Sequence, residues 1–62
     1  MEIDIEDCMA IASLSGHYHV VVYMMKNGAT NFNECIANAE KNGHENIVQL
    51  MRLHGANNIQ YF

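Results

Sequence analysis

Residues 8–34 read CMAIASLSGHYHVVVYMMKNGATNFNE, and residues 35–61 read CIANAEKNGHENIVQLMRLHGANNIQY. These stretches decide the fold, because they align without a gap at a shift of 27 residues. A fixed period of this length is the signature of a repeat architecture. The identical pairs are Cys8 and Cys35, Ala10 and Ala37, Ala12 and Ala39, Gly16 and Gly43, His17 and His44, Val21 and Val48, Met24 and Met51, Gly28 and Gly55, Ala29 and Ala56, and Asn31 and Asn58.

Each unit is predicted to hold two short antiparallel helices. Apolar residues recur at helical spacing twice per unit, and a glycine separates the two segments. Gly16 and Gly43 stand where a helix end needs a left-handed residue, and Gly28 and Gly55 end the second helices. The predicted inward-facing residues are Ile5, Met9, Ala12, Val20, Val21 and Met24 in the first unit, and Phe32, Ile36, Ala39, Ile47, Val48 and Met51 in the second.

Polar residues mark where the first helix of each unit begins. Asp4, Asn31 and Asn58 occupy equivalent positions and are typical N-cap residues. Glu34 follows Asn31 at the third helical position, from which its side chain can return a hydrogen bond to the N–H of the cap. We therefore expect one domain over residues 1–62, with one unit at about 4–30, a second at about 31–57, and the start of a third unit or a tail at 58–62.

The recurring motifs resemble the core of an ankyrin repeat. They are Gly16-His17, Val20-Val21 and Gly28-Ala29, repeated as Gly43-His44, Ile47-Val48 and Gly55-Ala56. Ankyrin repeats usually run to about 33 residues, and the missing length is the β-hairpin finger. The resemblance implies an all-α fold of two stacked helix-turn-helix repeats without such fingers, a fragment of an α-solenoid. The linker from Gly28 to Asn33 is similar to those of ankyrin-like arrays in large cytoplasmic DNA viruses.

The same resemblance implies a non-enzymatic protein–protein interaction module, viral and acting inside the host cell, in its cytoplasm. Ankyrin proteins usually contact a protein partner through residues at the start of the first helix and just before the Gly-His pair. Met25 is a further candidate contact, because its counterpart in the second unit is the polar Arg52. Leu14 and Ile11 likewise have the polar counterparts Lys41 and Asn38. The candidate partner-binding residues are therefore Glu6, Leu14, Ser15, Met25, Asn33, Lys41 and Asn42.

Composition excludes several other classes of function. A chain of 62 residues is too short for an elaborate enzyme with its own cofactor domain. Three basic against seven acidic residues argue against nucleic-acid binding. The longest uncharged run contains serine, glycine and histidine, so we expect no membrane span. The acidic start is unlike a secretory signal, which predicts an intracellular protein.

The cysteines and histidines have structural interpretations. Cys8 and Cys35 lie one helix-packing distance apart in the predicted stack, about 8–10 Å, which is too far for a disulfide. We expect buried free thiols at the helix contact. His17 and His44 are expected to bond turn backbone and join one unit to the next, while His19 and His54 face solvent. We therefore predict no catalytic, cofactor-binding or metal-binding residues and no cofactor.

Self-association is the alternative function. Two repeats are fewer than the three that such arrays usually need, and no polar end unit is evident. The apolar ends, Ile3–Met9 and Ile59–Phe62, would then bind further copies, a protein partner or a longer repeat array. The acidic residues Glu2, Asp4, Glu6 and Asp7 are interpreted as a solvated helix start, or alternatively as a surface for a basic partner.

Overall fold

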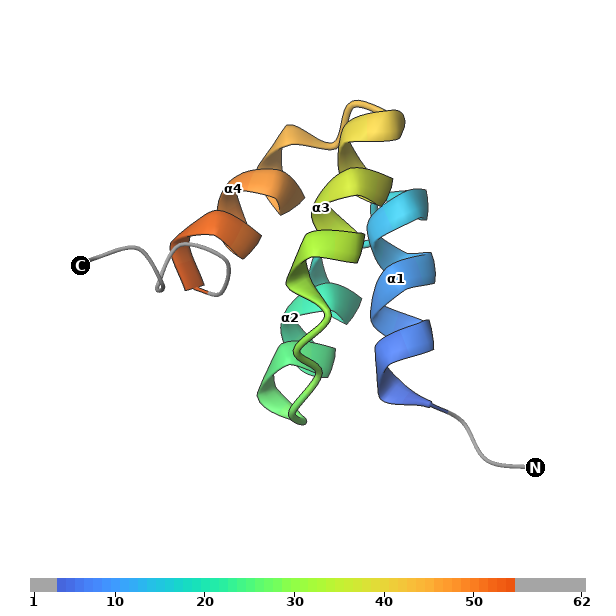
Figure 1. Cartoon of the computed structure of the whole chain (residues 1–62), viewed down its shortest axis with the longest axis vertical. Helices are drawn as coiled ribbons and strands as arrows, with labels where there is room; N and C mark the ends of the chain where they lie inside the picture. Colours follow the sequence, from blue (N-terminus) through green and yellow to red (C-terminus); the bar gives the residue numbers. More distant parts are fainter. Residues whose placement is uncertain (1–3, 55–62) are drawn as a thin grey trace.

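Four helices make up the protein over the residues that the computed structural model describes, which are 4–54. They are α1 (Ile5–Ser15), α2 (Tyr18–Lys26), α3 (Phe32–Lys41) and α4 (Glu45–His54) (Figure 1). No strand occurs within this range. The predicted all-α class is therefore confirmed for the described residues.

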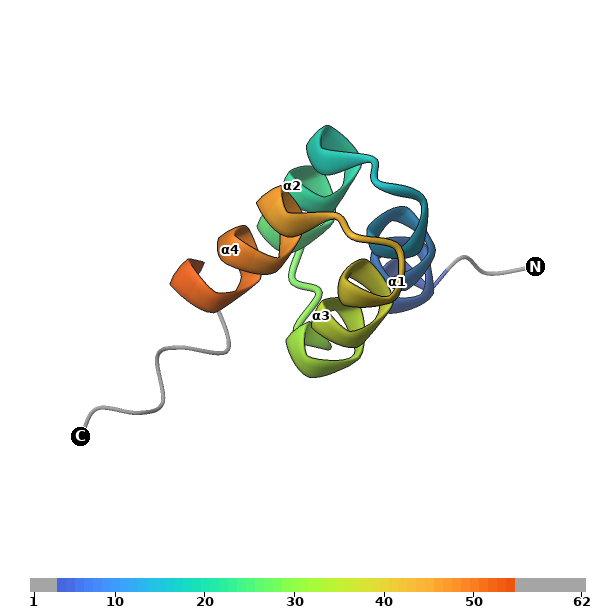
Figure 2. The same ribbon diagram turned by 90° about the horizontal axis from the view of Figure 1, so that it is seen from above.

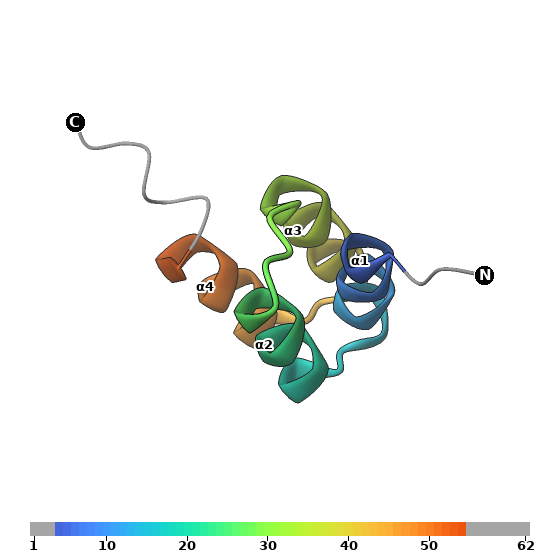
Figure 3. The same ribbon diagram turned by 90° about the horizontal axis from the view of Figure 1, so that it is seen from below.

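The helices form two pairs that lie against each other. α1 packs on α2, α3 packs on α4, and the largest contact between the pairs joins α1 to α3. Seen from above and from below, α1 and α3 lie side by side in one row, and α2 and α4 lie in a second row next to it (Figures 2 and 3). α2 also touches α4, through a smaller contact than the one between α1 and α3.

Local chemistry explains where the helices begin and end. Asp4 caps α1, because its Oδ1 accepts a hydrogen bond of 2.9 Å from the backbone N–H of Glu6. Gly16 ends α1 with φ 83°, and the N–H of His17 reaches back to the carbonyl of Ala12 at 2.9 Å. This bond across a left-handed residue closes the helix end in a Schellman motif. The left-handed conformation predicted for Gly16 is confirmed, as it is for Gly43 with φ 75°.

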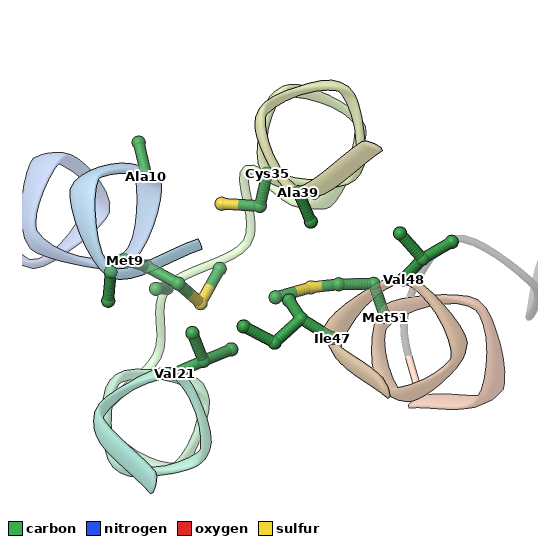
Figure 4. Close-up of a cluster of buried hydrophobic side chains, with 10 residues drawn as sticks. Met9, Ala10, Val21, Cys35, Ala39, Ile47, Val48 and Met51 are labelled. Carbon is green, nitrogen blue, oxygen red and sulfur yellow. The ribbon is translucent and has the colours of Figure 1, made fainter. Parts of the chain in front are cut away.

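The core lies where the four helices meet. The side chains of Met9, Val21 and Ile47 converge there from α1, α2 and α4 (Figure 4). Most of the other buried side chains are small, so the helices approach closely along α1 and α3. The buried apolar residues are Met9, Ala10, Ala12, Val21, Ala29, Cys35, Ala39, Ile47, Val48 and Met51.

Three sequence predictions need correction, two about the core and one about a helix start. Val20 is 43% exposed, because the side of α2 on which it lies meets no other described helix. Cys8 is only half-buried, whereas Cys35 is buried as expected. Asn31 is the N-cap position of α3, but its side chain makes no capping hydrogen bond. Its amide Nδ2 instead donates to the carbonyl of Glu6 at 2.9 Å and to Glu34 at 3.1 Å.

Several other predictions concern segments outside the described residues. These are the glycine at 55, the cap at Asn58, and the apolar ends at Ile3 and Ile59–Phe62. Within residues 4–54, no helix has the length and the apolar character that crossing a bilayer requires.

Candidate interaction site

Three asparagine side chains join α3 to α1. Their amide groups donate to backbone carbonyls that are spaced four residues apart, so the accepting oxygens follow one side of α1. A side-chain amide that donates to a carbonyl specifies the position of one helix along the other, because each bond requires alignment. The bonds are Asn31 to Glu6 at 2.9 Å, Asn38 to Ala10 at 3.1 Å, and Asn42 to Leu14 at 2.7 Å.

His44 adds a fourth polar contact at the end of α1. Its Nε2 donates to the carbonyl of Leu14 at 3.1 Å, so the predicted bond between this histidine and the turn of the first pair is confirmed. The carbonyl of Leu14 lies in the last turn of α1, where helix carbonyls lack intrahelical partners. His17 does not match the prediction, because it is exposed and its side chain makes no capping hydrogen bond.

A shallow groove follows this junction on the solvent side of α1 and α3. Asp7, Ile11 and Leu14 line it from α1, and Ala10 also contributes to its lining. Glu34 and Asn38 line it from α3. The spacing of Asp7, Ile11 and Leu14 at i, i+4 and i+7 places these three side chains on one face of the helix. The groove therefore combines the apolar side chains of Ile11 and Leu14 with the polar side chains of Asp7, Glu34 and Asn38.

Ile11 is the most unusual residue in the groove. Its side chain is 63% exposed although it is a large aliphatic residue. Leu14 beside it is half-buried, so the two residues form a continuous apolar strip. Asp7 lies one turn before Ile11 on the same face of α1, and Glu34 lines the groove from α3; both residues are exposed. An apolar strip next to two acidic residues can bind a segment that carries an apolar side chain beside a basic one.

The structure brings part of the predicted contact set to this groove. Leu14 lines it, and Ser15, which directly follows, is exposed. Lys41 and Asn42 lie at the end of α3 and are exposed. The amide of Asn42, however, already donates to the carbonyl of Leu14. Asn42 therefore contributes to the junction between the helix pairs.

The remaining predicted contacts lie elsewhere. Glu6 is half-buried, and its carboxylate accepts a hydrogen bond of 3.1 Å from the hydroxyl of Thr30. Asn33 is exposed in the first turn of α3. Met25 lines a separate depression between α2 and α4 with Leu50. The structure thus separates Met25 from Leu14, although both belong to the predicted contact set.

Two polar groove residues, Glu34 and Asn38, were not among the predicted contacts. Asp7 was predicted only as part of the acidic start, with a surface for a basic partner as the alternative, and its spacing of four to Ile11 and seven to Leu14 indicates that it shares their helix face. Glu34 and Asn38 are also four residues apart. Their position beside α1 follows from the packing of α3 on α1, which periodicity alone does not specify.

Possible metal ligands and the two thiols are the remaining chemical groups of interest. Within 4–54, no group of three or more His, Cys, Asp or Glu side chains is arranged to hold a metal ion. Cys8 and Cys35 are both free thiols. Burial raises the pKa of the Cys35 thiol, so Cys35 stays protonated at neutral pH and is a poor nucleophile.

Comparisons with protein-family models, with curated proteins and with solved structures gave no match.

Proposed function

We propose that the chain is an ankyrin-like protein of two stacked repeats that binds another protein without catalysing a reaction. The two helix pairs support this proposal through one shared detail of backbone geometry. The N–H of His17 bonds to the carbonyl of Ala12 at 2.9 Å, and the N–H of His44 bonds to Ala39 at 2.8 Å. Both donors and both acceptors are separated by the 27-residue period. A common turn geometry at the same place in each pair is what a structural repeat requires.

The groove between α1 and α3 is the proposed binding site. The observation that carries the proposal is the exposed Ile11 next to Leu14. A partner that covers this aliphatic strip removes apolar surface from water, which stabilises the complex. The asparagine bonds hold α1 and α3 in register beneath the groove. The binding surface is therefore preorganised, so ordering its side chains on binding costs less free energy.

The partner is a protein segment with an apolar anchor and a neighbouring lysine or arginine. The anchor would cover Ile11 and Leu14, and the basic group would approach Asp7 or Glu34. The net charge of −4 favours the approach of a basic segment over long distances. Viral origin and action in the host cytoplasm belong to the same proposal and are supported by the linker resemblance alone.

Selection from a random peptide library on the immobilised chain tests this function. We expect enriched peptides to contain an aliphatic or aromatic residue within a few positions of a basic residue. Ile11→Asp should weaken their binding by about 30-fold or more, as expected for a central contact. Asp7→Asn should weaken binding less and should reduce its dependence on salt.

Leu53→Asp is the matched control, because Leu53 is 68% exposed and lies on α4. It introduces the same charge outside the groove and should leave binding unchanged. Enriched peptides that bind Ile11→Asp as tightly as the unmodified chain would show that the groove is not the binding site. Circular dichroism of each variant establishes that the helices remain formed.

A further inference from the structure

Two positions on α2 are more exposed than their counterparts 27 residues later on α4. Val20 is 43% exposed, whereas Ile47, its counterpart on α4, is fully buried. Tyr23 is 62% exposed, whereas its counterpart Leu50 is half-buried and packs against the core. In the second pair these positions are covered by the first pair, as the contact of Ile47 with the core shows (Figure 4). In the first pair no described residue covers them.

Cys8, Val20 and Tyr23 therefore form the outer face of the first pair, the side turned away from α3 and α4. Cys8 fits the same pattern, since it is half-buried and its counterpart Cys35 is fully buried. Cys8, Val20 and Tyr23 carry no charge, and no Asp, Glu, Lys or Arg occurs from Cys8 to Met25. The exposed charges one helical turn away are Asp4, before Cys8, and Lys26, after Tyr23. These two charges have opposite signs, so the outer face does not present one sign of charge to a second copy.

The opposite end of the molecule differs in chemistry. Glu40 and Arg52 form a salt bridge of 3.2 Å there, and their side chains are 53% and 59% exposed. Their counterparts in the first pair are Ser13, which is buried, and Met25, which lies beside Leu50. Stacking the apolar outer face of one copy on this end of another would remove both charges from water. That desolvation is costly when the covering surface supplies no compensating hydrogen bonds.

We propose that the outer face of the first pair binds the same face of a second copy, giving a dimer with two-fold symmetry. Each Val20 and Tyr23 then packs on apolar atoms of the second copy, and the Glu40–Arg52 end stays in water. A two-fold contact uses the same patch on both chains and closes the assembly at two subunits. This inference goes beyond the proposed groove function, because the dimer uses the outer face and leaves the groove between α1 and α3 accessible.

Sedimentation equilibrium of the complete 62-residue chain over a dilution series tests the proposal. We expect a reversible monomer–dimer equilibrium with no larger species. Val20→Asp and Tyr23→Asp should each raise the dimer dissociation constant by about 30-fold or more, because each places a charge in an apolar contact. Leu53→Asp is the matched control and should leave the dissociation constant unchanged, since Leu53 lies on α4.

A second measurement does not depend on variants. Backbone amide NMR shifts of the unmodified chain should change on dilution around Cys8, Val20 and Tyr23 and should stay constant around Arg52. A chain that remains monomeric at millimolar concentration would overturn the proposal. So would an open series of larger oligomers with shift changes at both ends, because that pattern indicates head-to-tail stacking.

Tyr23→Ser, which adds no charge, should also weaken the dimer, and an unchanged dissociation constant for this variant would count against the proposed face.

Discussion

The imidazole of His44 lies directly against the backbone of Gly16. A Cβ atom added at Gly16 would stand 2.6 Å from the Cε1 of His44, closer than two carbon atoms can approach without displacement. The same imidazole donates through Nε2 to the carbonyl of Leu14. One side chain of the second helix pair thus packs on the turn of the first pair and also satisfies a carbonyl at the end of α1.

Replacing the two turn glycines by alanine should separate backbone strain from this contact. Gly43→Ala should lower the free energy of unfolding by about 1–2 kcal/mol through backbone strain alone, because φ is positive. Apart from chain neighbours, no described residue lies within 4 Å of the added Cβ. Gly16→Ala should cost about 1–3 kcal/mol more, because the methyl group also meets the His44 ring. Urea unfolding followed by circular dichroism measures both. Equal losses would show that the His44 ring moves away freely.

The contact between Gly16 and His44 should also appear as coupling in a double-mutant cycle. His44→Ala alone should lower the unfolding free energy by about 1 kcal/mol through the lost hydrogen bond to Leu14. Adding Gly16→Ala to that variant should then cost no more than Gly43→Ala does, because the ring is gone. Strict additivity of the two substitutions would contradict the contact.

The asparagine bonds predict a difference between two asparagines of α3. Asn38→Ala should destabilise the fold by about 1 kcal/mol, because it removes the donor to the carbonyl of Ala10. Asn33→Ala is the control, since Asn33 is exposed and alanine has the higher helix propensity. It should be neutral or slightly stabilising. Thermal unfolding of both variants measures the difference, and a similar loss for each would argue against the role of Asn38.

Burial of Cys35 predicts slow alkylation and weaker folding at alkaline pH. Its pKa is raised above the ordinary value of 9.0, chiefly by burial, so the folded state holds this proton more tightly than the unfolded chain. The stabilising contribution is complete below about pH 9 and declines as the pH rises above it. The unfolding free energy of Cys35→Ala should depend less on pH in this range. Iodoacetamide at neutral pH should modify Cys8, which is half-buried, before Cys35.

Equivalent positions in the two helix pairs should respond differently to truncation. Ile47→Ala should lower the unfolding free energy by about 2–5 kcal/mol, because Ile47 is fully buried. Val20→Ala should cost less than about 1 kcal/mol in dilute solution, because Val20 is 43% exposed. Unfolding at low protein concentration makes the comparison for the monomer. A large loss for Val20→Ala under those conditions would mean that a segment of the same chain covers it.

Much of the backbone could be predicted because the signals are local. The N-cap at Asp4 and the left-handed turns at Gly16 and Gly43 depend on a few neighbouring residues. Apolar spacing placed Met9, Ile47 and Met51 in the core. His44 was correctly expected to bond turn backbone, although its contact with Gly16 was not foreseen.

The candidate site was only partly predictable, because it lies between helices. Family position indicated Leu14, but Asp7, Glu34 and Asn38 enter the same groove only through the packing of α3 on α1. Asn31 shows the same limit. Its sequence position specifies an N-cap, yet its amide donates to α1 because the carbonyl of Glu6 lies within 2.9 Å.

By itself, the sequence determined four helices, the cap at Asp4, the left-handed turns at Gly16 and Gly43, and the face of each helix that carries apolar residues. These features follow from spacing, capping residues and the conformational freedom of glycine, all of which act within a few residues of the chain. Only the tertiary structure decided which apolar faces are covered. Val20 and Ile47 occupy equivalent positions and have similar side chains, yet one is exposed and the other buried. Burial is a property of the neighbouring helix, and only the second pair has another described pair packed against that side.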